Sequence, residues 1–266
     1  MRGKIIKRFL IKVLRKAVKL LAKTNPKLLA KLEVELQNVQ GKGSGAATTE
    51  AEAKMALNFL SWSSTNKLVV LDIGANIGSY SEAIRKFAPQ ATVFAFEPSS
   101  IARKSLEDKF MGDRSVTVVP LALGNKNSKE ILWSDTPGSL LASLTKRRLK
   151  HFGIDFSQSE SVEVVTLDSW ASSTKVVPSL IKMDVEGHEL DVLKGGFKTL
   201  ALAKVVQFEF GGCNIDTRTF FQDFWYLLTE AGFQIHRISE GGPIHISHYS
   251  EQEECFRTTN YLAVRG

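Results

Sequence analysis

From residue 68 onward, short apolar runs alternate with segments of helical periodicity. Apolar runs of this length that end at turn-forming residues are typical of strands buried on both faces. We expect strands at 68–74, 91–97, 115–123, 179–185 and 204–210, weaker strands at 128–133, 161–167, 234–239 and 260–265, and helices at 79–88, 99–110, 188–200 and 218–231. This alternation predicts an α/β fold with a mostly parallel sheet and helices on both faces.

Residues 4–23 show apolar and basic side chains at helical spacing, which predicts an amphipathic helix. The frequent charges exclude a membrane span, which needs about 20 mostly apolar residues, and they interrupt the apolar core that a secretory signal needs. The apolar positions are Ile6, Leu10, Val13, Ala17, Leu20 and Leu21, and the basic ones are Lys4, Lys7, Arg8, Lys12, Arg15, Lys16, Lys19 and Lys23.

Three roles remain open for this N-terminal helix. It could lie on an anionic membrane surface, act as an organelle-targeting presequence, or pack its apolar stripe on the protein's own body. We expect a cytoplasmic protein, with residues 4–23 as the segment that would contact the inner face of a membrane.

The positive charge belongs to the N-terminal segment. Residues 1–40 contain eleven Lys or Arg and two Glu, a net charge of +9, whereas the remainder carries a net charge of −2. The overall charge of +7 therefore does not indicate a nucleic-acid partner for the main body. Cys213 and Cys255 lack a metal-ligand spacing, which is typical of a protein from a reducing compartment.

Glycines mark a boundary between two parts of the chain. Residues 41–47 read GKGSGAA and predict a flexible joint. Thr49 and Glu52 then match a capping box at the start of a helix that runs to about Trp62. We therefore expect an N-terminal helix and linker over 1–45 and one α/β domain over 46–266.

A glycine-rich turn follows the first expected strand. Ligands in such sheets bind at the carboxyl ends of the strands, and here the strand ends in Asp72-Ile73-Gly74-Ala75-Asn76-Ile77-Gly78. The glycines allow tight turning and a close approach of the backbone to a ligand. The second strand ends in Glu97-Pro98, and a carboxylate there can accept hydrogen bonds from both ribose hydroxyls of an adenosine ligand.

The loop does not match a dinucleotide site. That fingerprint needs glycine at its first, third and sixth positions, but the third position from Gly74 is Asn76 and the sixth is Ser79. Acids such as Asp72 suit a cationic ligand better than a pyrophosphate. The pattern favours S-adenosylmethionine over a nicotinamide cofactor.

Ionisable residues crowd the end of the fourth parallel strand, in the run KMDVEGHE at 182–189. Acids on buried strands are rare without a function, so we consider the cluster a candidate catalytic site. The candidate catalytic residues are Asp184, Glu186, His188 and Glu209. For each one, a structural role such as a helix N-terminal acid or an internal Lys–Asp pair is the alternative.

Several motifs together resemble the FkbM family of methyltransferases: LDIGANIGSYS (71–81), FAFEPS (94–99), LALGN (121–125), VVTLDSW (164–170) and KMDVEGHELDVLKGG (182–196). The resemblance implies a class I methyltransferase fold with a seven-stranded sheet, S-adenosylmethionine as cofactor, and transfer to a hydroxyl of a sugar, glycan or natural product. It places Gly74, Asn76 and Gly78 at the cofactor loop, Glu97 at the ribose and Ala122 at the adenine. Pro120 and the segment GSLLASL (138–144) depart from the family pattern.

The expected reaction is an in-line attack of an acceptor hydroxyl on the methyl carbon, for which alignment and a general base suffice. The base would be one of the four candidates above, and Asp184 could instead hold the cofactor's ammonium group. A Mg²⁺-assisted variant through Asp184, Glu186 and Glu209 is a weaker alternative, since these acids have no fixed motif spacing. A catalytically silent binding protein and a nicotinamide-dependent oxidoreductase are the competing functions. The sequence does not define the acceptor or the oligomeric state.

Overall fold

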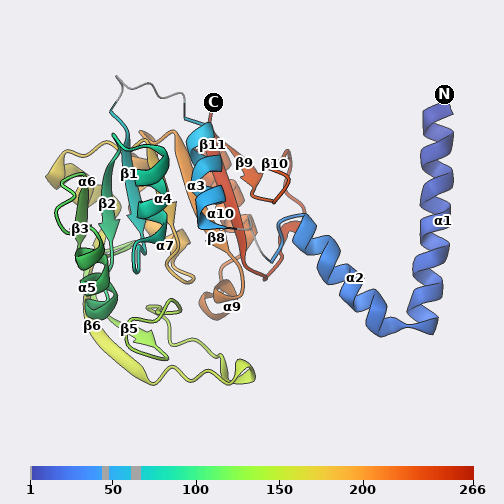
Figure 1. Ribbon diagram of the computed structural model, residues 1–266, viewed down its shortest axis with the longest axis horizontal. Helices are drawn as coiled ribbons and strands as arrows, with labels where there is room; N and C mark the ends of the chain where they lie inside the picture. Colours follow the sequence, from blue (N-terminus) through green and yellow to red (C-terminus); the bar gives the residue numbers. More distant parts are fainter. Residues whose placement is uncertain (1, 44–47, 61–66) are drawn as a thin grey trace. The chain divides into compact units, whose positions relative to one another are not determined.

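The computed structural model describes residues 2–43, 48–60 and 67–266, and the chain forms two compact units, Met1–Gln40 and Gly41–Gly266. The first unit contains helices α1 (Arg2–Thr24) and α2 (Pro26–Val39) (Figure 1). The sequence analysis missed α2, although Asn25 caps it by accepting a hydrogen bond from the Leu28 amide, and proline in the first turn is a typical start signal. Within the described residues, every helix is too short or too polar to cross a membrane.

The main sheet of the second unit has eight strands in the order β10-β9-β11-β8-β7-β1-β2-β3. Strands β1, β2, β3, β7 and β8 pair in parallel, while β11 runs antiparallel to both β8 and β9. The predicted α/β fold with a mostly parallel sheet is confirmed, and the short edge strand β10 brings the expected seven strands to eight. The strands are β1 (Val69–Ile73), β2 (Thr92–Phe96), β3 (Val116–Val119), β7 (Leu180–Met183), β8 (Val205–Phe210), β9 (Phe233–Arg237), β10 (Ile244–Ile246) and β11 (Thr259–Arg265).

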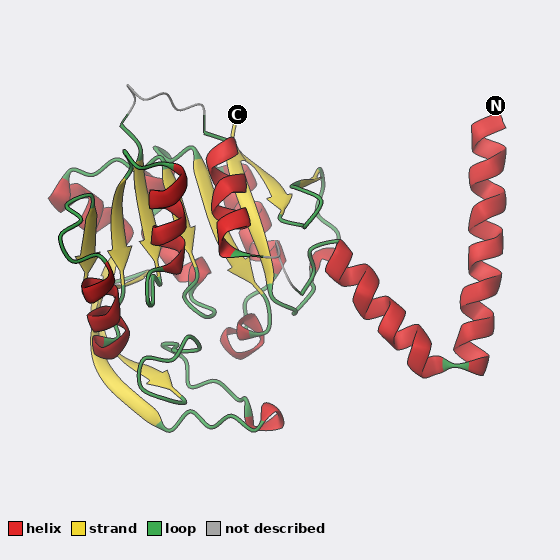
Figure 2. Cartoon of the chain, in the orientation of Figure 1, coloured by secondary structure: helices red, strands yellow, loops and turns green. Residues whose placement is uncertain are grey.

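Helices cover both faces of this sheet (Figure 2). Helices α3 (Thr49–Asn58), α4 (Ser79–Phe87) and α5 (Ser100–Lys109) lie on one face, and α6 (Leu167–Thr174), α7 (Glu189–Gly195), α8 (Phe197–Leu200) and α10 (Phe221–Glu230) lie on the other. On β1, Val70 packs into the cluster of α3 and α4, whereas Leu71 packs with α7 and α10. Because successive side chains face opposite layers, β1 carries apolar side chains on both faces, with Asp72 as the exception.

The strand predicted at 115–123 is wrong as one element, since it divides at Pro120. Its first half is β3, and its second half, β4 (Ala122–Gly124), joins β6 (Gln158–Thr166) and β5 (Ser128–Ser134) in a separate three-stranded sheet. Proline has no amide hydrogen and cannot continue the ladder. We call the segment 135–157, which connects β5 to β6, the arm; it contains the short helix η1 (Lys150–Phe152).

Helix boundaries differ from the prediction in several places. Thr48, not Thr49, caps α3 by accepting a hydrogen bond from the Ala51 amide. The helix predicted at 188–200 divides into α7 and α8 around Gly196. Helix α9 (Cys213–Thr217) and the short helix η2 (Glu251–Glu253) were not predicted. Residues 44–47 of the predicted joint, and Trp62, lie outside the described residues.

Candidate active site

The turn after β1 lies against the ends of β2 and β7. The Gly74 and Ala75 amides both donate to the Phe96 carbonyl oxygen, at 3.0 and 2.9 Å. Gly74 has a φ of +77°, and a Cβ atom there would lie 1.9 Å from the Asp184 carbonyl oxygen. Only glycine fits such a position. The backbone of this turn therefore sits directly beside the end of β7.

Glu97 holds the same turn from the end of β2. Its Oε2 accepts a hydrogen bond from the Asn76 amide and its Oε1 accepts one from the Ser99 amide, each at 2.8 Å. Burial raises the pKa of Glu97 to about 7, against the opposing effect of these hydrogen bonds and of Lys182. The carboxylate thus lies fixed at the rim of the turn and gains its charge near neutral pH.

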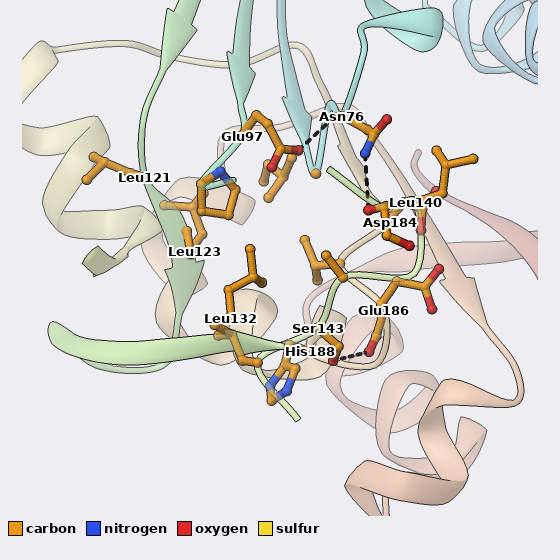
Figure 3. Close-up of a pocket in the computed structure, with 18 residues that line it drawn as sticks. Asn76, Glu97, Leu121, Leu123, Leu132, Leu140, Ser143, Asp184, Glu186 and His188 are labelled. Carbon is orange, nitrogen blue, oxygen red and sulfur yellow. Dashed lines mark hydrogen bonds between the residues drawn. The ribbon is translucent and has the colours of Figure 1, made fainter. Parts of the chain in front are cut away.

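A cavity of about 590 Å³, partly open to solvent, lies between these strand ends and the arm. Figure 3 shows Glu97 and Asn76 at one end and His188 at the other. Leu121, Leu123 and Leu132 lie along one side, and Asp184 and Glu186 lie along the opposite side. The predicted site residues that line it are Gly74, Asn76, Glu97, Pro98, Ala122, Asp184, Glu186 and His188.

Four predicted site residues do not line this cavity. Ala75 packs with α5, and a Cβ atom on Gly78 would collide with Leu106 and Phe110, so Gly78 serves helix packing. Asp72 is fully buried beneath the turn, where it accepts hydrogen bonds from the Ser81 amide and hydroxyl. Glu209 lies on β8, and its carboxyl group interacts electrostatically with Asp184, Glu186 and Glu189.

A buried lysine connects the two strand ends. Lys182 Nζ lies 3.3 Å from Asp72 Oδ1, 3.7 Å from Asp184 Oδ2 and 3.3 Å from the Gly74 carbonyl oxygen. Burial alone would lower the pKa of Lys182, but the two carboxylates raise it above its ordinary value. The lysine therefore stays charged and holds the turn after β1 against the end of β7.

The turn that carries Glu186 depends on Glu189. Glu186 has a positive φ of 53°, and the fully buried Glu189 carboxylate accepts hydrogen bonds from the Val185 amide at 2.8 Å and the Gly187 amide at 3.1 Å. Burial and the nearby Asp184 raise the pKa of Glu186 to about 8, although Arg147 opposes this. Burial, together with Asp184, also raises the pKa of Glu209.

The sequence analysis missed Arg147, which comes from the arm and is nearly buried. Its Nη1 is paired with Glu186 Oε2, and its Nε lies 3.6 Å from Asp216 Oδ2. Neighbouring arm residues also reach the site, since the Ser143 hydroxyl donates to the Glu186 carbonyl oxygen at 2.8 Å. The only local signal was the basic run at 145–151, which does not reveal partners 39 or 69 residues away.

His188 contacts polar groups at both ring nitrogens. Its Nε2 lies 3.0 Å from Thr145 Oγ1, and its Nδ1 lies 3.0 Å from Asp191 Oδ2. The hydrogen bond from His188 is the main cause of the lowered pKa of Asp191.

The acids do not form a metal centre. Across residues 2–43, 48–60 and 67–266, no group of three or more His, Cys, Asp or Glu side chains is arranged to hold a metal ion. Asp184 and Glu186 instead face Lys182 and Arg147. The Mg²⁺ alternative is therefore not supported.

The sheet order, the turn after β1 and the acid at the end of β2 define a class I methyltransferase fold. The sequence profile of the methyltransferase FkbM domain matches residues 72–235, and the chain belongs to this family. The resemblance found in the sequence is confirmed.

Two curated relatives are similar over part of the chain. The hexuronic acid methyltransferase AglP of Haloferax volcanii is 33% identical over 129 residues, which is 48% of this chain and 49% of AglP. The 2-O-methyltransferase NoeI of Sinorhizobium fredii is 29% identical over 154 residues, which is 53% of this chain and 63% of NoeI. The chain thus spans less than two thirds of either relative.

One solved structure, the plantazolicin methyltransferase BpumL in complex with SAH, is 12% identical to this chain and has a TM-score of 0.45. The alignment covers 98% of this chain and 100% of BpumL. A likeness this weak adds nothing to the family match.

Proposed function

We propose that this protein is an S-adenosylmethionine-dependent O-methyltransferase that acts on a hydroxyl group of a sugar. The observation that carries the proposal is the placement of Glu97 at one end of a cavity whose other residues include Asp184 and His188. Family membership supports the cofactor. The names of AglP and NoeI, a hexuronic acid methyltransferase and a 2-O-methyltransferase, support a sugar-like acceptor.

The cavity residues suit S-adenosylmethionine. Glu97 would accept the ribose hydroxyls, and the apolar side at Ala122 would hold the adenine. Gly74 and Asn76 would form the turn around the amino-acid end, and Asp184 would face its positive charge. When bound, this cofactor supplies a methyl group on a positively charged sulfur.

Of the four candidate bases, His188 fits best. Glu186 is paired with Arg147 and Asp184 lies near Lys182, so both carboxylates already face a cation. Glu209 does not line the cavity, and its raised pKa favours the protonated form. His188 lines the cavity with a neutral partner, Thr145, at Nε2.

His188 Nε2 would accept the proton of the acceptor hydroxyl as the oxygen attacks the methyl carbon. A general base of this kind contributes roughly 10²–10⁴-fold to the rate. The partly exposed Asp184 carboxylate would face the cofactor's positive charge, which is lost as the methyl group leaves.

A radiolabel screen tests the function. The full chain is incubated with methyl-tritiated S-adenosylmethionine and a panel of uronic-acid and neutral oligosaccharides, with His188→Gln as the catalytic control. We expect label in an acid-stable, base-stable ether on one sugar class, reduced at least 100-fold in the control. Cofactor binding without transfer to any hydroxyl compound would favour the silent binding protein instead.

We also propose that α1 contacts an anionic membrane surface. At 3.6 residues per turn, Arg8, Lys12, Arg15, Lys16, Lys19 and Lys23 lie within an arc of about 100°. Over residues 6–23 the remaining arc is apolar apart from Lys7, and its side chains Phe9, Leu10, Leu14 and Leu20 are exposed. Helix α1 has one basic and one apolar face and contains no acid. The basic face suits anionic lipid headgroups, and the apolar face suits the boundary between the headgroups and the acyl chains.

Vesicle co-sedimentation tests this contact. We expect the full chain to bind vesicles of phosphatidylglycerol and phosphatidylcholine, to bind pure phosphatidylcholine at least tenfold more weakly, and to lose binding in Lys12→Glu/Lys16→Glu/Lys19→Glu. Lys27→Glu/Lys31→Glu in α2 is the charge control and should retain most of the binding. Equal binding to both vesicle types, or equal losses in both variants, would refute a role for the basic face of α1.

A further inference from the structure

Four polar side chains form a continuous chain beside the cavity. Thr145 Oγ1 lies 3.0 Å from His188 Nε2, His188 Nδ1 lies 3.0 Å from Asp191 Oδ2, and Asn125 Nδ2 donates to Asp191 Oδ1 at 2.7 Å. These residues come from the arm, from the start of α7 and from the turn after β4. Each contact has an ordinary hydrogen-bond length.

The chemistry of Asp191 determines the direction of these bonds. An aspartate side chain is ionised at neutral pH at its ordinary pKa, and the pKa of Asp191 is lowered further, so the group is a carboxylate that can only accept. His188 Nδ1 must therefore donate. In a neutral ring the other nitrogen, Nε2, is then the acceptor, and the Thr145 hydroxyl donates to it.

The backbone holds this chain in place. His188 is the N-cap of α7 and Asp191 lies in its first turn, so the two face one another across three residues. Helix α7 also packs tightly on β4: a Cβ atom on Gly195 would lie 2.0 Å from the Gly124 carbonyl oxygen and 3.2 Å from the Asn125 Cα atom. This close contact fixes Asn125 beside Asp191.

We propose that Asp191, held by Asn125, is a positioning residue that keeps His188 in the tautomer with Nε2 free to accept the proton of the acceptor hydroxyl. This inference rests on the proposed function. The Thr145 hydroxyl then occupies, in the free protein, the hydrogen-bonding position that the acceptor hydroxyl takes during the reaction. The alternative is a structural one, in which Asp191 merely stabilises the N-terminus of α7 as acids in a first helical turn commonly do.

Histidine ¹⁵N spectroscopy and kinetics together distinguish the two roles. The full chain is labelled at its histidine rings, and the His188 signals are assigned with His188→Gln. We expect the wild type to show the Nδ1–H tautomer, and Asp191→Asn to shift the population toward Nε2–H. Asp108→Asn, which removes an acid from an exposed pair on α5, is the matched control and should leave the spectrum unchanged.

With the acceptor from the radiolabel screen, Asp191→Asn should reduce kcat at least 100-fold, change the S-adenosylhomocysteine Kd less than threefold, and be partly rescued in Asp191→Glu. An unchanged tautomer, or an unchanged kcat despite a changed tautomer, would overturn the inference. A wild-type chain that binds no S-adenosylhomocysteine would instead defeat the proposed function. The two failures can be told apart, because the tautomer measurement needs neither cofactor nor acceptor.

Discussion

Replacing Gly74 with alanine tests how closely the turn after β1 approaches the end of β7. The added Cβ atom would lie 1.9 Å from the Asp184 carbonyl oxygen, so the two backbones must separate by more than 1 Å to reach about 3.2 Å. The positive φ costs roughly 1–2 kcal/mol for an L-residue. The separation also strains two backbone hydrogen bonds, from Gly74 to Phe96 and from Asp184 to Ile73, which contribute about 1 kcal/mol each.

The expected loss in the free energy of unfolding is therefore about 3–4 kcal/mol, which lowers the Tm by roughly 6–16 °C in a domain of this size. Gly112→Ala is the matched control, because Gly112 has a φ of +87° with nothing within 4 Å of the added Cβ atom. Gly112→Ala should lower the free energy of unfolding only by the cost of the positive φ, about 1–2 kcal/mol. Thermal unfolding and calorimetric binding of S-adenosylhomocysteine are measured on both variants.

Gly74→Ala should also weaken S-adenosylhomocysteine binding at least tenfold, since the displacement moves Asp184, while Gly112→Ala should bind normally. Equal losses of stability in the two variants, with normal binding in both, would refute the close approach as the reason for glycine at this position.

Three further predictions concern pH, metals and thiol reactivity. The pKa of Glu97 is raised to about 7, and under the proposed function its ionised form accepts the ribose hydroxyls, so cofactor affinity should rise between pH 6 and pH 8. Calorimetry should show this rise disappearing in Glu97→Gln; a rise that persists would assign it to another group. Since Asp184 and Glu186 face Lys182 and Arg147, dialysis against EDTA should leave methyl transfer within twofold of the untreated rate, and loss restored by Mg²⁺ would contradict this. Burial raises the pKa of Cys213 above its ordinary value, so native alkylation followed by mass spectrometry should modify it at least tenfold more slowly than Cys255; equal rates would show that the region opens readily.

Local patterns in the sequence predicted the parallel strands at the centre of the sheet and eight of the residues that line the cavity. Strands such as β1 are short, mostly apolar and bounded by turn residues, and Glu97, the acid proposed to bind the ribose, comes directly after the end of β2. The predicted element boundaries were wrong where a single residue ends one strand or helix and another begins soon after it. Pro120 divides one apolar run into two strands of different sheets, and Gly196 divides one helical pattern into α7 and α8.

The pairings between distant segments were not predictable in this way. Arg147 belongs to a basic run whose local pattern is that of a solvated loop, and only the folded arm brings it to Glu186 and Asp216. Asp191 likewise has the local pattern of an ordinary helix N-terminal acid. Its contact with Asn125 depends on the packing of α7 against β4, which no local pattern encodes.

The most direct test of the central claim is calorimetric titration of the full chain with S-adenosylmethionine, S-adenosylhomocysteine and NAD. The proposed function predicts micromolar binding of both sulfur nucleotides, at least 100-fold weaker binding in Glu97→Ala, and no binding of NAD. Such a loss corresponds to about 3 kcal/mol, as expected for two hydrogen bonds to a charged group. Absence of binding in a folded chain, or binding of NAD alone, would contradict the assignment of this cavity to S-adenosylmethionine.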